Sequence, residues 1–282
     1  MPDGPVRVEF DHVRFSYPTA DKVSLASLEE VAVLDDRDDG EVLHGISFTA
    51  EPGQLVALVG SSGAGKSTIA ALLARLYDVD SGAVRLAGID VRDVTFASLR
   101  DTVGMVTQDG HLFHESIRAN LLLAAPDAGL DGAAGAASTD DQLWEVLHRA
   151  RLADVVAAMP DGFDTVVGER GYRLSGGQRQ RLTIARLLLG RSRVVVLDEA
   201  TAALDSSSEV AVQQALGEAL AGRTSLVIAH RLSTVRAADM ILVVEDGRIV
   251  ERGTHRQLIS RGGRYAELCE TQLGPQASEA VA

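Results

Sequence analysis

A lysine enclosed by glycines and hydroxyl residues is the part of the sequence best suited to chemistry. The stretch GSSGAGKST runs from Gly60 to Thr68, and its Lys66 is one of two lysines in a chain with 25 arginines. The spacing G-x-x-x-x-G-K-[ST] is typical of a phosphate-binding loop, whose backbone N–H groups surround phosphate oxygens. In such a loop Lys66 reaches the β- and γ-phosphates, and the hydroxyl of Ser67 binds Mg²⁺. The candidate phosphate-binding residues are Gly60, Ser61, Ser62, Gly63, Ala64, Gly65, Lys66, Ser67 and Thr68.

Two neighbouring acids supply a second candidate element. Asp198 and Glu199 follow the apolar run VVVL, which is typical of a strand buried on both faces of a parallel sheet. In open parallel sheets ligands bind at the carboxyl ends of the strands, so we expect both acids beside the Gly60–Thr68 loop. Asp198 is the candidate Mg²⁺ ligand, directly or through water, and Glu199 is the candidate that orients and polarises an attacking water.

A third motif, LSGGQ, opens a predicted helix with two glycines. Ser175 is a favourable N-cap residue, and the free N–H groups of a helix start attract anions. The chain therefore carries two anion-binding elements that lie far apart in sequence. The residues of the second element are Leu174, Ser175, Gly176, Gly177 and Gln178.

The elements that must position these motifs follow from apolar patterning. LVALV at 55–59 predicts a buried strand, and Ile69, Leu72, Leu73 and Leu76 recur at helical spacing after the loop. VRVEFDHVRFSYP and VLHGISFTA have strand-like alternation, whereas LWEVLHRARLADVVAAM and QRQRLTIARLLL are typical of helices. We therefore predict an α/β fold: a P-loop NTPase parallel-sheet core with an antiparallel β subdomain and an inserted α-helical subdomain.

Composition excludes several classes of protein. The formal net charge of −13 argues against a protein built to coat nucleic acid, which needs a basic face. The single cysteine, Cys269, allows no internal disulfide and fits a reducing cytosol. The apolar runs are all shorter than the ~18 residues that a membrane span requires, so we expect the isolated domain to be soluble.

Taken together, the motifs resemble the nucleotide-binding domain of ABC transporters. The P-loop, LSGGQ and the VVVLDE run about twenty residues later carry the resemblance, which extends from Tyr17 to about Gln272. It implies that the LSGGQ of one subunit closes on the ATP held by the P-loop of another. GERG at 168–171 and the segments LFHESIRANL and GTHRQLISRGGRYAELC resemble exporters rather than importers.

The resemblance also implies roles for residues outside the three motifs. Tyr17 would stack on adenine, so a phenylalanine ring would serve there almost equally well. Gln108 would sense Mg²⁺ and the membrane domain, Asp205 would be the D-loop aspartate, and His230 would contact the γ-phosphate. The implied catalytic set is Glu199, His230, Gln108 and Lys66, and the implied metal ligands are Ser67, Gln108 and Asp198. Ala202 stands where the family usually has serine, and the insertions at 19–41 and 129–139 match no family role.

The sequence thus predicts the Mg-dependent ATPase domain of an ABC exporter. The domain covers residues 5–272, with a helical subdomain at about 110–188, a disordered tail at 273–282 and a membrane domain expected upstream of residue 1. Expected partners are a second nucleotide-binding domain, identical or different, and the membrane domain, at the cytoplasmic face of the inner membrane; no nucleic acid is expected. Two alternatives stay open: a soluble ABC ATPase that acts on nucleic acid, and a regulatory subunit that binds nucleotide without hydrolysis.

Overall fold

The structure is a computed structural model that describes residues 4–18, 40–107, 111–125, 140–168, 174–190, 192–198, 206–229 and 231–271. The insertion predicted at 129–139, the tail at 273–282 and all but the last two residues of the insertion at 19–41 lie outside these residues. In the described part of the chain, no helix combines the length and the apolar character needed to cross a membrane.

A sheet with the strand order β10-β9-β3-β8-β7-β6 forms the centre of the described chain. All of its neighbouring strands pair in parallel except β9 and β10, which form an antiparallel hairpin. Alternate residues of β3 belong to different cores, with Ala57 packed on one face and Leu58 on the other. Burial on both faces explains the unbroken apolar runs and confirms the predicted parallel-sheet core. The strands are β3 (Leu55–Val59), β6 (Val103–Val106), β7 (Val194–Asp198), β8 (Thr224–Ile228), β9 (Met240–Glu245) and β10 (Arg248–Gly253).

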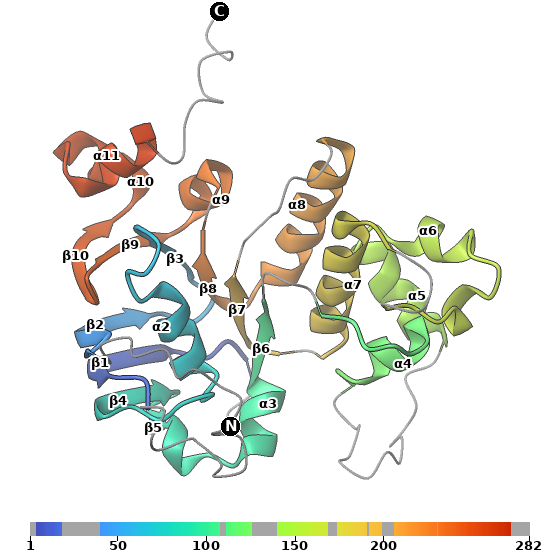
Figure 1. The fold of residues 1–282 in the computed structure, drawn as a ribbon, viewed down its shortest axis with the longest axis horizontal. Coiled ribbons are helices and arrows are strands. Elements are labelled where there is room, and N and C mark those ends of the chain that lie inside the picture. Colours follow the sequence, from blue (N-terminus) through green and yellow to red (C-terminus); the bar gives the residue numbers. More distant parts are fainter. Residues whose placement is uncertain are drawn as a thin grey trace, which may run out of the picture.

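An antiparallel sheet with the order β2-β1-β4-β5 lies beside this core (Figure 1). Helix α2 (Lys66–Leu73) contributes Ile69 and Leu72 to the same apolar core as strands from both sheets. Ile69, Leu72 and Leu73 therefore join the two sheets, whereas Leu76, predicted on the same helical face, lies beyond the end of α2 and is exposed. The strands of this second sheet are β1 (Val8–Phe15), β2 (Leu43–Ala50), β4 (Ser81–Leu86) and β5 (Ile89–Asp90).

Helices fill the described chain between β6 and β7. They are α4 (Ile117–Leu122), α5 (Asp140–Arg149), α6 (Ala153–Ala157), a 3₁₀ turn at Gly162–Asp164 and α7 (Gly176–Leu189). Figure 1 shows α4, α5 and α6 at the end of the molecule opposite the antiparallel sheet, with α7 and α8 (Ser206–Leu220) between them and the central sheet.

The segment LWEVLHRARLADVVAAM forms two helices rather than one. Arg151 adopts a positive φ of 55°, and the N–H of Leu152 donates to the carbonyl oxygen of Leu147 at 2.9 Å. This pairing closes α5 as a Schellman motif does, with a left-handed residue just past the helix end. The buried Leu152 is then the N-cap residue of α6.

The remaining helices surround the sheets. They are a 3₁₀ turn at Val91–Asp93, α3 (Phe96–Thr102), α9 (Leu232–Ala237), α10 (His255–Arg261) and α11 (Arg264–Thr271). Leu258, Tyr265 and Leu268 anchor the last two helices in the core that α7 and α8 share. The C-terminal helices thereby close one side of the parallel sheet.

Candidate active site

The Gly60–Thr68 loop connects the end of β3 to the start of α2, as the motif predicts. Gly60 and Gly65 have φ values of 151° and 98°, a region that residues with a side chain rarely adopt. A Cβ at residue 60 would stand 2.0 Å from the carbonyl oxygen of Val244, and one at residue 65 would stand 2.7 Å from Leu43. The loop is therefore packed so closely on β9 and β2 that these two positions require glycine.

Lys66 is folded inside its own loop. Its Nζ donates to the carbonyl oxygens of Gly60 at 2.8 Å and Ser61 at 2.6 Å, and the residue is buried. Burial lowers the pKa of the ammonium, and the negative charge of Asp198 partly opposes that shift. The loop thus holds a desolvated cation whose present partners are neutral carbonyls, an arrangement well suited to accepting a phosphate oxygen.

Ser67 and Asp198 meet although 131 residues separate them. Both Leu58 of β3 and Asp198 of β7 pair in register with Ile228 of the intervening strand β8. The ends of β3 and β7 are therefore level, and the Ser67 hydroxyl donates to Asp198 Oδ2 at 3.4 Å. A hydroxyl and a carboxylate side by side are the hard oxygen ligands that Mg²⁺ uses when phosphates supply the rest of its shell. The two residues fit the predicted metal site.

Tyr17 lies beside the same loop. Its hydroxyl and Thr68 Oγ1 are 2.9 Å apart, within hydrogen-bonding distance. Its ring contacts Phe15 and Tyr77 at nearly right angles, with centroid separations of 5.0 and 5.3 Å. The sequence analysis assigned a role only to the ring of Tyr17. The contact between its hydroxyl and Thr68 and the ring contact with Tyr77 were not predicted.

The LSGGQ turn begins α7 with a reciprocal cap. Ser175 Oγ accepts from the N–H of Gln178, and Gln178 Oε1 accepts from the N–H of Ser175. The sequence predicted the serine cap but not the bond that Gln178 returns. The spacing S-x-x-Q, which is typical of a capping box, would have indicated that second bond. Leu174 is buried in the core. Ser175 and Gln178 bond only within their own turn in the described chain, so no bond links this motif to the P-loop of the same molecule.

Four predicted site residues lie outside the described residues: Gln108, Glu199, Asp205 and His230. Ala202 and most of the GERG segment lie outside them as well. The structure therefore brings together the phosphate loop, Tyr17 and Asp198, and it leaves the proposed roles of these four as predictions from the sequence.

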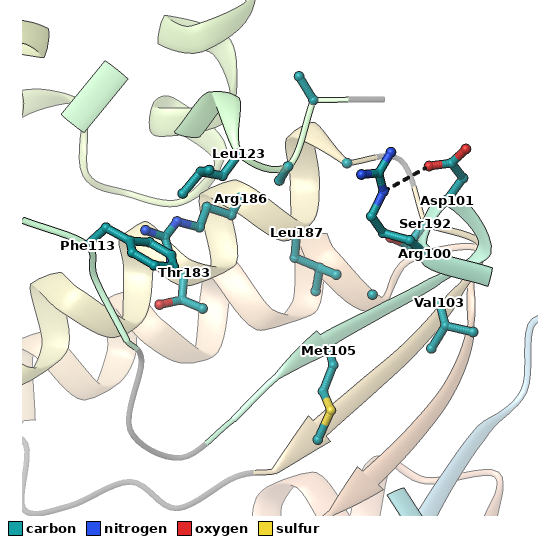
Figure 2. Close-up of a pocket in the computed structure, with 14 residues that line it drawn as sticks. Arg100, Asp101, Val103, Met105, Phe113, Leu123, Thr183, Arg186, Leu187 and Ser192 are labelled. Atoms are coloured by element: carbon teal, nitrogen blue, oxygen red, sulfur yellow. Dashed lines mark ion pairs between the residues drawn. The ribbon is translucent and has the colours of Figure 1, made fainter. Parts of the chain in front are cut away.

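A separate cavity of about 290 Å³ lies between β6 and the helical part of the fold. Figure 2 shows Phe113, Leu123 and Arg186 on its helical side and Val103 and Met105 on β6. Phe113 and Leu123 are 51% and 56% exposed, which is high for large apolar side chains.

Buried Asn120 fixes the rim of this cavity. Its side chain accepts from the N–H of Phe113 and donates to the carbonyl oxygen of the same residue, both at 3.0 Å. Arg186 donates to the carbonyl oxygens of Asn120 at 2.8 Å and His111 at 2.7 Å. The backbone of Phe113 is therefore held by the side chain of Asn120, while its exposed ring makes an edge-to-face contact with His111 at 5.3 Å.

The geometry of the loop and of the parallel sheet is that of a P-loop nucleotide-binding domain. A family model described as ABC transporter matches residues 43–202, which is more than half of the chain. This chain belongs to the ABC transporter family.

Known relatives support the same assignment. The chain is 46% identical over 270 residues to the ATP-dependent lipid A-core flippase of Burkholderia pseudomallei, covering 96% of this chain and 41% of the relative. It is 46% identical over 270 residues to human ATP-binding cassette sub-family B member 6, covering 96% of this chain and 29% of the relative. A solved bacterial Atm1-family ABC exporter with ATP bound matches with a TM-score of 0.78 and 39% identity, over 98% of this chain and 44% of that chain.

These matches confirm the resemblance to the nucleotide-binding domain of ABC exporters that the motifs indicated. They also favour the exporter interpretation over the two alternatives left open by the sequence. The chain spans less than half the length of the relatives that it matches.

Proposed function

We propose that this chain binds Mg-ATP, hydrolyses it and thereby drives export through a membrane domain. The observation that carries the proposal is the position of Lys66, buried within the Gly60–Thr68 loop and near the Ser67–Asp198 pair. Family membership supports ATP as the nucleotide.

The residues of the loop would bind the triphosphate. Lys66 would exchange its carbonyl partners for oxygens of the β- and γ-phosphates, which compensate its charge better than neutral dipoles do. Ser67 and Asp198 would hold Mg²⁺, which neutralises charge on the phosphates. Tyr17 would stack on adenine.

The sequence motifs supply the remaining groups. Glu199 would orient and polarise the attacking water, and His230 would contact the γ-phosphate. Gln108 would link the metal to the membrane domain, and Asp205 would act in the D-loop. Hydrolysis here depends on positioning and on charge stabilisation rather than on covalent catalysis.

A second nucleotide-binding domain would complete the site. The first N–H groups of α7 have no acceptors within the helix, and their positive end attracts anions. Because the side chains of Ser175 and Gln178 bond only within their own turn in the described chain, we assign the phosphate of this turn to the P-loop of a partner domain.

The cavity beside β6 is the proposed contact with the membrane domain. Its exposed Phe113 and Leu123 are typical of a surface that a partner covers. The relatives extend well beyond the region that this chain matches, which leaves room in such a protein for membrane-spanning segments. The domain would then lie at the cytoplasmic face of the membrane.

Two variants of the purified chain test hydrolysis and the two-domain site. Lys66→Ala should abolish hydrolysis and sharply weaken ATP binding. Glu199→Gln should lower hydrolysis by about 10²–10⁴-fold, since it loses only the group that orients water. It should accumulate as a dimer in Mg-ATP but not in ADP, as measured by light scattering on a sizing column. Wild-type turnover in Lys66→Ala would remove the P-loop assignment, and a monomeric, fully active Glu199→Gln protein would remove the two-domain mechanism.

A further inference from the structure

The hydroxyl of Tyr17 has a defined partner in the phosphate loop. Thr68 Oγ1 lies 2.9 Å away, and Thr68 itself is buried. Stacking on a base needs only the aromatic face, so adenine contact gives no reason for this bond. The bond instead ties residue 17, two positions beyond the end of β1, to the helix that carries the P-loop.

The ring of Tyr17 is held by two other aromatic rings. Phe15 is buried and meets it at 5.0 Å with an interplanar angle of 82°; Tyr77 is 40% exposed and meets it at 5.3 Å with an angle of 89°. Phe15 and Tyr77 also contact each other at 5.5 Å. Such edge-to-face pairs are favourable, and in neither contact is the ring of Tyr17 stacked in parallel. The ring remains 37% exposed.

The two contacts restrict different parts of the same side chain. Thr68 fixes the tip, whereas Tyr77 fixes the flank of the ring, and both belong to α2 or to the turn that follows it. If the Tyr17 ring exchanged among several rotamers, only the molecules with the correct rotamer would bind adenine. The apparent affinity for ATP would then be reduced in proportion to the fraction of such molecules. Holding the ring beforehand removes this cost.

We propose that Thr68 and Tyr77 are positioning residues that hold Tyr17 in the orientation that accepts adenine. The inference rests on the proposed function, since it takes Tyr17 as the adenine platform. The proposal connects Tyr17, which follows strand β1 of the antiparallel sheet, with the P-loop, which follows strand β3 of the parallel sheet. It also changes the expectation for Tyr17→Phe, which loses the bond to Thr68.

Thr68→Val tests the hydroxyl contact. Valine keeps the branched shape and the backbone N–H, and it removes only the oxygen that Tyr17 contacts. We expect ATP to bind about two- to tenfold more weakly, the usual range for one lost hydrogen bond. Tripolyphosphate carries the phosphates without the base. Thr68 belongs to the phosphate loop, but valine keeps the backbone N–H with which such a loop binds phosphate, so the affinity for tripolyphosphate should fall less than the affinity for ATP. Equal weakening of both ligands would confine Thr68 to the phosphate loop and overturn the proposal, as would no change in either.

Tyr77→Leu tests the ring contact, with Tyr77→Phe and Leu76→Ala as matched controls. We expect Tyr77→Leu to weaken ATP about two- to tenfold and to leave tripolyphosphate unchanged, because an edge-to-face pair is lost. Phenylalanine keeps the ring, and Leu76 is the exposed neighbour outside the ring cluster, so both controls should bind ATP like the parent. An equal loss in Leu76→Ala, or none in Tyr77→Leu, would overturn the role of Tyr77.

A double-mutant cycle separates this inference from the proposed function. Tyr17→Ala should weaken ATP but not tripolyphosphate, and in that background Thr68→Val and Tyr77→Leu should have no further effect. If Tyr17→Ala binds ATP like the parent, adenine stacks elsewhere and the base-site assignment fails. If Tyr17→Ala weakens ATP while the other two variants are silent, only the positioning role fails. Additive losses would also overturn it.

Discussion

Replacing Gly60 with alanine should damage the protein far more than the same change at Gly63. Both glycines lie in the P-loop and both have positive φ, at 151° and 80°. A Cβ at residue 63 would meet nothing within 4 Å, whereas a Cβ at residue 60 would stand 2.0 Å from the carbonyl oxygen of Val244. Comparing the two variants therefore separates the free-energy cost of backbone strain, which both share, from the cost of the steric clash, which occurs only at residue 60.

The expected magnitudes follow from these two terms. An L-residue in a left-handed conformation costs about 1–2 kcal/mol, which both variants incur. At residue 60 the oxygen of Val244 must also retreat by about 1 Å within a central strand, and overpacking of this kind costs roughly 1–3 kcal/mol more. We expect the free energy of unfolding to fall by about 2–5 kcal/mol in Gly60→Ala and by about 1–2 kcal/mol in Gly63→Ala.

Thermal unfolding of the two purified variants checks this difference. For a chain of this size each kcal/mol lowers Tm by about 2–4 °C, so Gly60→Ala should melt roughly 4–20 °C below the parent and Gly63→Ala about 2–8 °C below it. Urea unfolding should give the same order. Equal shifts in both methods would show that the contact with Val244 relaxes without cost, and the close packing of the loop on β9 would then be refuted.

Two further predictions concern the metal and the cavity. Asp198→Asn should raise the Mg²⁺ concentration for half-maximal ATPase activity by about 10–100-fold, because a neutral amide is a poorer ligand for Mg²⁺ than a carboxylate is. Titration of Mg²⁺ into EDTA-treated protein measures this, and an unchanged midpoint would exclude Asp198 as a ligand. Leu123→Asp should leave the ATPase rate of the purified chain within about twofold while abolishing transport by the full-length protein, since the exposed rim of the cavity is changed and the nucleotide site is not. Normal transport would exclude this cavity as the membrane-domain contact.

The parts of the site that the sequence predicted depend on local chemistry. The P-loop can be recognised in the sequence because Gly60, Gly65 and Lys66 must follow one another at fixed spacing. Asp198 lies beside the loop because the carboxyl ends of parallel strands meet at one edge of the sheet, and its role as a metal ligand stays a prediction. Two apolar runs sufficed to predict that edge, since both strands are buried on both faces.

The features that escaped prediction depend on contacts between distant segments. Tyr17 and Thr68 are 51 residues apart, and nothing in either local pattern indicates that their hydroxyls meet. The division of α5 from α6 rests on the left-handed conformation of Arg151, which an arginine adopts only where surrounding packing favours it. The exposed rim of the cavity could not be foreseen either, because Asn120 of α4 bonds to Phe113 and Arg186 of α7 bonds to His111, so two separate helices hold one loop.

Helix α7 has a mechanical consequence under the proposed function. Its first turn is the LSGGQ motif, and its last turn lines the cavity through Arg186 and Leu187. Fourteen residues make a rod about 21 Å long, capped at its start by Ser175 and unbroken to Leu189. A rotation of roughly 10° about its midpoint displaces each end by about 2 Å in opposite directions. Under the proposed function, a rigid rotation of α7 would therefore turn a movement of about 2 Å at the partner's phosphates into an opposite movement of similar size at the cavity proposed to contact the membrane domain. The helix itself would not need to change its conformation.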